Sequence, residues 1–187
     1  MRKFMVFQLM LFWAVPTSAS VNIEGVSFEQ RRQVVDTELR LTGTALLTWA
    51  LIFDVYVGGF YLPDGKQESN WIDNVPKVLE IAYLRNFKAE DFSNSSDQLL
   101  RENLPPEKYS TLVDRLHDFY QLFRDIKKGD RYSLVYHPAI GTELRLNGEP
   151  LGSVDGHDFA VAYFGLWLGP DPIDETFRDR LLHHVVD

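Results

Sequence analysis

The sequence contains no cysteine and only five histidines. A chain without thiols forms no disulfide bond and offers neither a thiolate nucleophile nor a cysteine ligand for zinc. His117, His137 and His157 are scattered, and the neighbouring side chains of His183 and His184 would project differently, which makes a poor chelating pair. We therefore expect no metal site and no cofactor, and a fold that rests on packing alone.

Basic residues are also in short supply, with 19 lysines and arginines against 27 acidic residues and a formal net charge of −8. An acidic protein repels phosphate groups and anionic lipid surfaces, so we expect no nucleic-acid partner. The sequence has no Ser-His-Asp spacing, no glycine-rich phosphate loop and no convincing pair of carboxylates. No repeat or linker divides residues 20–187, which indicates one domain.

A hydrophobic run long enough to cross a bilayer is absent as well. The N-terminus carries Arg2 and Lys3, then an apolar stretch over residues 4–15, then a small-residue exit over 16–19. This layout predicts a signal peptide over residues 1–19, since the apolar run of about 12 residues is shorter than the roughly 20 that span a membrane. A retained anchor is the alternative interpretation. Cleavage after Ala19 would change the formal net charge from −8 to −10, because Arg2 and Lys3 are lost. We expect a periplasmic or secreted protein that meets the membrane only through this segment before cleavage.

The rest of the chain predicts strands first and then a mixture of helices and strands. The hydrophobic patterns favour strands over residues 21–28, 34–42, 44–50, 51–62, 77–85, 131–136, 142–146 and 149–154. Asn147 and Gly148 are typical of a tight hairpin turn. Helices are predicted over residues 88–103, 106–128 and 159–168, followed by a last helix with Asp174 as its N-cap. The fold class is therefore α+β, a meandering antiparallel sheet covered by helices.

The strand LIFDVYVGGFYLP, residues 51–63, is the most informative segment. Alternation places Leu51, Phe53, Val55 and Val57 on one apolar face, which we expect to face a core. The other face carries Ile52, Asp54, Tyr56 and Gly58. A glycine inside a strand often marks a bulge or the close approach of a ligand or another backbone. The segment is therefore the first place to look for a site.

Five segments together resemble the bacterial chalcone isomerase-like family, of which this chain would be an exported member. They are LRLTG (39–43), DVYVGGFYL (54–62), residues 77–87, the pair Gly129-Asp130 before a strand, and the block FAVAYFGLWLGPDPIDETFRDRLL (159–182). Their order and spacing cover nearly all of residues 20–187, which we assign to one chalcone isomerase-like domain. The resemblance implies an open-faced sandwich, with a large antiparallel sheet covered on one side by helices and a ligand cleft between the layers.

Members that resemble this chain include plant enzymes that cyclise chalcones without a cofactor, and proteins that bind fatty acids in the same cleft. In the enzymes, an arginine precedes the VYVGGFYL-like strand and holds the substrate's oxygen. The matching residues 44–48 of this chain contain no basic side chain. The family's second polar cluster is also missing, because Phe92 replaces a tyrosine and no lysine follows in that helix. A cleft without a cation cannot stabilise a phenolate by charge, so both differences argue against chalcone cyclisation.

Four residues are candidates for ligand binding. Tyr56 stands where the resemblance implies threonine in the enzymes and tyrosine in the fatty-acid binders, although it could equally be a core tyrosine. Tyr83 and Arg85 share one predicted strand face, and Arg85 could supply the cation that a fatty acid requires, or it could be solvated. Asp54 could act as a pocket acid or base, or could form an ordinary ion pair.

Three functional hypotheses follow. The first is a non-catalytic protein that holds an apolar small molecule, such as a fatty acid, in the cleft. The second is a cofactor-independent isomerase or intramolecular lyase that acts on an enone with a different polar set, such as Asp54 and Tyr56. The third is a structural or interaction protein whose cleft has collapsed, and a continuous cavity of ligand size would weaken it. The ligand and the oligomeric state are left open.

Overall fold

The structure is a computed structural model that describes residues 19–49, 53–66 and 68–182. Residues 1–18, and with them nearly all of the predicted signal peptide, lie outside the described residues. In the described part of the chain, no helix is both long enough and apolar enough to cross a membrane.

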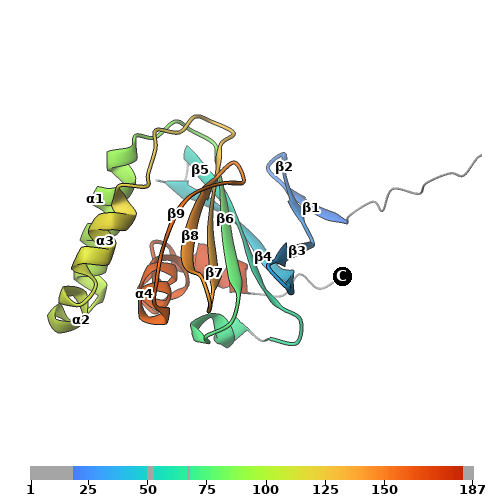
Figure 1. The fold of residues 1–187 in the computed structure, drawn as a ribbon. Helices are drawn as coiled ribbons and strands as arrows, with labels where there is room; N and C mark the ends of the chain where they lie inside the picture. The colour runs from blue at the N-terminus through green and yellow to red at the C-terminus, as the bar shows by residue number, and fades with distance from the viewer. Residues whose placement is uncertain (1–18, 50–52, 67, 183–187) are drawn as a thin grey trace, which may run out of the picture.

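Seven strands form one antiparallel sheet in which each strand pairs with the next along the chain (Figure 1). In this order they are β3 (Arg31–Val34), β4 (Thr37–Trp49), β5 (Phe53–Pro63), β6 (Lys77–Tyr83), β7 (Arg131–His137), β8 (Gly141–Leu146) and β9 (Glu149–Val154). A separate hairpin of β1 (Ser20–Ile23) and β2 (Val26–Glu29) precedes them. The predicted meander is confirmed.

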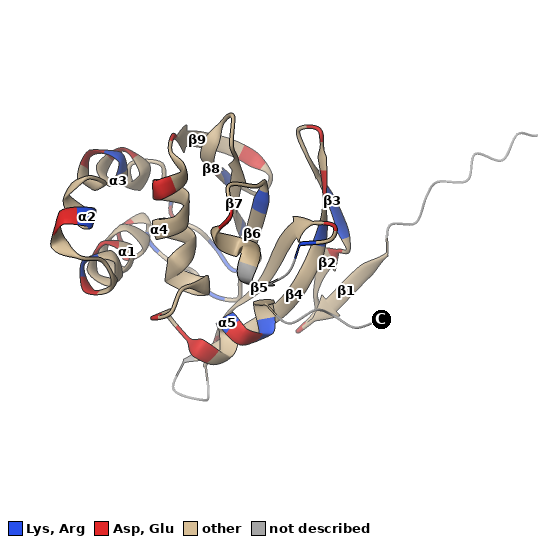
Figure 2. Ribbon diagram, turned by 90° about the horizontal axis from the view of Figure 1, so that it is seen from below, with Lys and Arg blue, Asp and Glu red and all other residues tan. Residues whose placement is uncertain are grey.

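The helices of the described residues gather on one face of this sheet, with the β1–β2 hairpin on the other side (Figures 1 and 2). They are α1 (Ala89–Asn103), α2 (Pro106–Ser110), α3 (Val113–Tyr120), α4 (His157–Leu168), α5 (Glu175–Leu182) and the short 3₁₀ helix η1 (Glu68–Ile72). Helix α4 contacts both α1 and β8, while α5 packs on β4 and β5. The predicted α+β open-faced sandwich is confirmed.

An aromatic ring packs against each of the two glycines of β5. A Cβ atom on Gly58 would lie 2.5 Å from Cζ of Phe177 in α5, and one on Gly59 would lie 2.7 Å from Cδ1 of Phe28 in β2. Gly58 therefore opens space on the helix side of the sheet, and Gly59 opens space on the hairpin side. Two side chains of the core, and neither a ligand nor another backbone, make the close approach at these glycines.

A bulge in β5 changes which residues share a face. Leu47 of β4 pairs with Tyr56, but the next residue of β4 pairs with Asp54, so Val55 is an extra residue in the ladder. Val55 consequently packs with Tyr56 against the helix-side core, whereas Val57 lies in the core beneath the hairpin. Phe53 is 39% exposed, and Leu51 and Ile52 lie outside the described residues. The prediction that Phe53, Val55 and Val57 share one buried face was wrong, because alternation holds only where the ladder is regular.

Two strand predictions near the N-terminus were also wrong. Residues 21–28 form a hairpin because Glu24 and Gly25 adopt positive φ angles of 50° and 75°. Residues 34–42 contain a turn at Val35, whose φ is 53°, so β3 ends at Val34 and β4 runs unbroken from Thr37 to Trp49.

The long helix predicted over residues 106–128 is broken into α2 and α3. The hydroxyls of Ser110 and Thr111 each donate to the carbonyl three residues earlier, which competes with helical backbone bonding. After Tyr120 the chain leaves the helix, since Ile126 forms an antiparallel bridge with Phe87. The apolar spacing shows which side of the segment is buried, but it does not reveal these local interactions that interrupt the helix.

Other local predictions are confirmed. Helix α1 begins one residue after Lys88 and ends at Asn103. Asn147 and Gly148 take φ angles of 53° and 88° in the turn between β8 and β9. The carboxylate of Asp174 accepts a hydrogen bond of 2.7 Å from the backbone N–H of Phe177 and so caps α5.

A buried carboxylate connects β3 and the β1–β2 hairpin to the central strands of the sheet. Glu80 of β6 points to the hairpin side, is 3% exposed, and forms ion pairs with Arg32 of β3 and Arg131 of β7. Arg131 also donates to the backbone carbonyl of Ser27 and lies over the ring of Phe28. This cluster positions Phe28 against Gly59.

Candidate functional site

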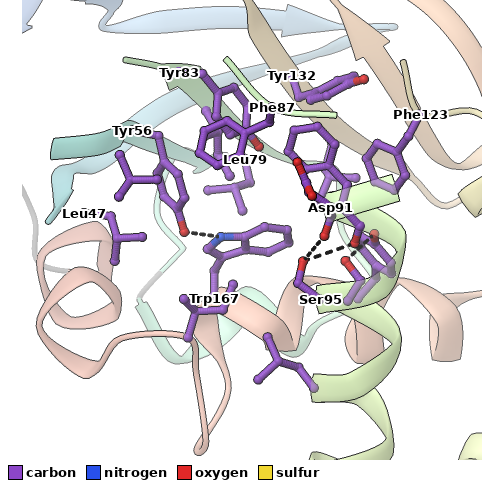
Figure 3. Close-up of a pocket in the computed structure, with 18 of the residues that line it drawn as sticks. Leu47, Tyr56, Leu79, Tyr83, Phe87, Asp91, Ser95, Phe123, Tyr132 and Trp167 are labelled. Atoms are coloured by element: carbon purple, nitrogen blue, oxygen red, sulfur yellow. Dashed lines mark hydrogen bonds between the residues drawn. The ribbon is translucent and has the colours of Figure 1, made fainter. Parts of the chain in front are cut away.

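A cavity of about 530 Å³ lies between the sheet and the helices (Figure 3). This volume falls within the range of small-molecule sites in proteins, roughly 300–1,000 Å³. The sheet, the following loop and the helices supply a mostly apolar and aromatic lining: Leu47, Val55, Tyr56, Leu79, Ile81, Tyr83, Phe87, Asp91, Phe92, Ser95, Ser96, Leu99, Phe123, Tyr132, Leu134, Leu144, Tyr163, Trp167 and Ile173.

Regular alternation in the strands builds one wall of the cavity. Leu79, Ile81 and Tyr83 of β6 all face the helices because they are two residues apart. Tyr56 lies directly opposite Tyr83 in the β5–β6 ladder, so the two phenol rings stand side by side with centroids 5.6 Å apart. On the opposite wall, Tyr163 and Trp167 are one helical turn apart in α4.

The Tyr56 side chain is 7% exposed and its hydroxyl points into the cavity (Figure 3). The indole N–H of Trp167 donates a hydrogen bond of 3.1 Å to this hydroxyl, whose own proton is left to donate elsewhere. Burial raises the pKa of Tyr56 well above its ordinary value. The phenol is therefore a neutral hydrogen-bond donor at physiological pH, and Trp167 fixes its orientation.

Tyr83 lies deeper among aromatic rings and is 5% exposed. Its ring makes edge contacts with Tyr56, Phe87, Phe92 and Tyr132 at centroid distances of 5.4–6.1 Å. Burial also raises the pKa of Tyr83. Among the residues that the structure describes, none forms a hydrogen bond with the Tyr83 hydroxyl, although this side chain lines the cavity.

The remaining polar groups of the lining form hydrogen bonds within the protein. Tyr163 donates to the hydroxyl of Ser96 over 3.0 Å. The Tyr132 hydroxyl both donates to and accepts from the backbone of Arg124. The carboxylate of Asp91 accepts a hydrogen bond of 2.8 Å from the backbone N–H of Lys88. Tyr56 and Tyr83 offer two donors side by side on the sheet wall, and the Ser96 hydroxyl, which accepts from Tyr163, keeps a proton as well.

The structure separates the four predicted site residues into two pairs. Tyr56 and Tyr83 come together in the cavity, but Asp54 and Arg85 do not line it. Strand β6 ends at Tyr83, and the Arg85 guanidinium lies 4.7 Å from the ring centroid of Phe53 while its Nε donates to the backbone carbonyl of Asp54. The side chain of Asp54 is exposed and accepts a hydrogen bond from Thr48.

The stretch 44–48 and Phe92, where the family's polar residues are missing, both contribute to this cavity. Leu47, within residues 44–48, lies opposite Tyr56 in the β4–β5 ladder and lines the cavity. Phe92 of α1 stacks against Phe123, with centroids 5.2 Å apart. The side chains that these two segments contribute to the lining at Leu47 and Phe92 are apolar.

Sequence reasoning missed Trp167 and Phe123 as parts of the site. Trp167 belongs to the helix predicted to be buried, and its spacing of four residues from Tyr163 was the available signal, since both carry a polar atom within an apolar run. Phe123 was assigned to core packing, yet it lines the cavity.

A second, smaller cavity of about 410 Å³ lies between α1, α2 and α4 and contains Trp71, Leu112 and Val161 in its lining. Within the described residues, no group of three or more histidine or acidic side chains is arranged to hold a metal ion.

An antiparallel sheet with a layer of helices on one face and an aromatic cavity between the layers is an open-faced α+β sandwich. The chalcone isomerase-like family model matches residues 20–183, so the chain belongs to the chalcone isomerase-like family.

The crystal structure of an Arabidopsis thaliana fatty-acid binding protein has the same fold. It superimposes with a TM-score of 0.66 at 19% sequence identity, and the match covers 88% of this chain and 96% of the plant protein. No curated protein sequence matches this chain.

Proposed function

We propose that this protein binds an apolar small molecule, such as a fatty acid, in the cavity beside Tyr56 and Tyr83 without converting it. The observation that carries this proposal is the cavity of about 530 Å³, which has a mostly aliphatic and aromatic lining and few free polar groups. The plant structure of the same fold is a fatty-acid binding protein, which supports a lipid-like occupant. Ligand binding is also consistent with the absence of basic residues from positions 44–48.

The geometry gives less support to the isomerase alternative. An enone cyclisation needs a group that stabilises developing negative charge. Asp54 does not line the cavity, and Tyr56 and Tyr83 are kept protonated by burial, which raises the pKa of both phenols. They can polarise a bound oxygen weakly but supply no cation, and the one charged group among the described lining residues is the carboxylate of Asp91, which cannot stabilise a developing negative charge. The alternative of a collapsed cleft is weakened by the cavity itself.

Native mass spectrometry of protein purified without detergent tests this proposal. We expect a population with an added lipid-sized mass, or a protein that takes up a fatty acid or fatty alcohol when one is supplied. A folded protein that is ligand-free and ignores both additions would contradict the proposal.

Two matched variants locate the binding. Ile81→Phe enlarges a side chain that lines the main cavity and should abolish uptake, because the added ring occupies ligand space. Val161→Phe makes the corresponding change in the second cavity and should leave uptake intact. Loss of binding in Val161→Phe alone would place the ligand between α1, α2 and α4 instead.

We also propose that the protein is exported and acts in the periplasm or outside the cell. The support is the charged, apolar and small-residue pattern of residues 1–19. The intact mass of the protein from the periplasmic or culture fraction should correspond to a chain that begins at Ser20. A full-length protein retained in the membrane fraction would favour an uncleaved anchor.

A further inference from the structure

The main cavity contains no positive charge that could hold an ionised headgroup. Of the described residues that line it, Asp91 alone carries a formal charge, and that charge is negative. Arg85 is turned toward Phe53 and Asp54 outside the lining. At the neighbouring surface, the Lys88 ammonium pairs with Asp125 at 2.6 Å.

Burying a carboxylate in such surroundings is unfavourable. An ionised group that leaves water without a cation or several hydrogen-bond donors loses much of its solvation free energy, and in practice it binds in its neutral form. The other titratable groups facing this space are the phenols of Tyr56, Tyr83, Tyr132 and Tyr163, none of which can supply a positive charge. The electrostatics of the cavity thus select against anions.

The same cavity does offer hydrogen-bond donors for a neutral oxygen. The Tyr83 hydroxyl has no partner among the described residues, and the Tyr56 hydroxyl keeps a proton after accepting from Trp167. Because the two residues pair directly across β5 and β6, both donors come from adjacent positions on one wall. A carbonyl or hydroxyl oxygen can accept from them, while the apolar lining covers a hydrocarbon chain.

We propose that the ligand is an uncharged lipid-like molecule with an acceptor oxygen held by Tyr83 and Tyr56: a long-chain alcohol, aldehyde or ester, or a fatty acid in its protonated form. This inference rests on the proposed binding function and narrows its ligand class. Ionised fatty acid is the species that it excludes.

Competition between decanol and decanoate, with a neutral apolar fluorophore (N-phenylnaphthylamine) as the reporter, tests this selectivity. Carboxylic acids titrate at about pH 4 to 5, so the protonated fraction of decanoate falls about tenfold per pH unit above that range. Between about pH 6 and pH 8, the apparent Kd for decanoate should therefore rise about a hundredfold, while the Kd for decanol stays constant.

Two tyrosine variants test the donor. Tyr83→Phe should reduce decanol affinity relative to fluorophore affinity by about two- to tenfold, the effect of one hydrogen bond. Tyr61→Phe is the matched control, because Tyr61 is also buried with an unpartnered hydroxyl but lies on the opposite face of the sheet. It should bind decanol as the wild type does. Equal affinities of wild type and Tyr83→Phe would contradict the role of Tyr83.

A third variant adds a cation to the lining of the main cavity. Leu47→Arg introduces a guanidinium at a half-buried lining position opposite Tyr56. It should bind decanoate at about pH 8 at least tenfold more tightly than the wild type, because the bound carboxylate now has a counter-charge.

The outcomes separate the two proposals. If the wild type binds decanoate equally well at about pH 6 and pH 8, neutral selectivity is wrong while lipid binding stands. If the folded wild type binds neither decanol, decanoate nor the fluorophore, the binding function itself is wrong.

Discussion

Replacing Gly58 by alanine would place a methyl group where the ring of Phe177 lies. The ideal Cβ position is 2.5 Å from Cζ of Phe177, well inside the contact distance of two carbon atoms. Phe177 is 2% exposed and packs edge-on against Tyr56 with ring centroids 5.3 Å apart. The ring therefore has little room to retreat, and any displacement reaches the phenol that lines the cavity.

Overpacking a tight core in this way destabilises a protein by about 1–3 kcal/mol. For a chain of this length, each kcal/mol lowers Tm by about 2–4 °C, so we expect Gly58→Ala to melt about 2–12 °C below the wild type. Gly58→Ala should also weaken ligand binding, because a displaced Phe177 ring would shift Tyr56 and its hydrogen bond from Trp167.

A double-mutant cycle measured by urea denaturation isolates the contact. Phe177→Leu removes the atoms nearest to the new methyl group, so Gly58→Ala should be nearly neutral in that background. Phe28→Leu is the matched control, since Phe28 faces Gly59 on the other side of β5. If Gly58→Ala lowered the free energy of unfolding equally with and without Phe177→Leu, the contact between Gly58 and the Phe177 ring would be refuted.

Two further predictions concern charge. Glu80→Gln should lower the free energy of unfolding, measured in urea, by about 3 kcal/mol. This is the lower end of the range for a broken buried ion pair, because Arg32 and Arg131 are partly hydrated. An effect below about 1 kcal/mol would show that the cluster does not stabilise the fold. The Arg115 guanidinium lowers the pKa of Asp158 from 3.8 to about 2, so its contribution to stability is present above about pH 4 and is lost as the pH falls toward 2. Arg115→Gln should therefore flatten the fall in stability across this window, and an unchanged acid-denaturation profile would contradict that coupling.

The layers of the fold could be predicted because they depend on patterns within single elements. Residues such as Leu79 and Ile81 alternate along β6, so the sequence shows which face meets the helices. The turn at Asn147 and the cap at Asp174 follow from local backbone chemistry. None of these features requires knowledge of distant contacts.

The details of the site could not be predicted, because they depend on irregularities and on distant partners. Strand alternation places Arg85 beside Tyr83, but β6 ends before Arg85, whose side chain turns to Phe53. The bulge at Val55 changes which side of the sheet the residues of β5 face, and it brings Val55 into the cavity lining. The hydrogen bond from Trp167 to Tyr56 joins residues far apart in sequence, and no local pattern indicates it.

Soaking crystals of the protein with bromodecanol and locating the bromine by anomalous scattering would test the central claim most directly. We expect a single bromine peak in the cavity between β6 and α4, with the alcohol oxygen within hydrogen-bond distance of Tyr83. An empty main cavity at a concentration that saturates binding in solution, or bromine in the second cavity beside Val161, would contradict the account.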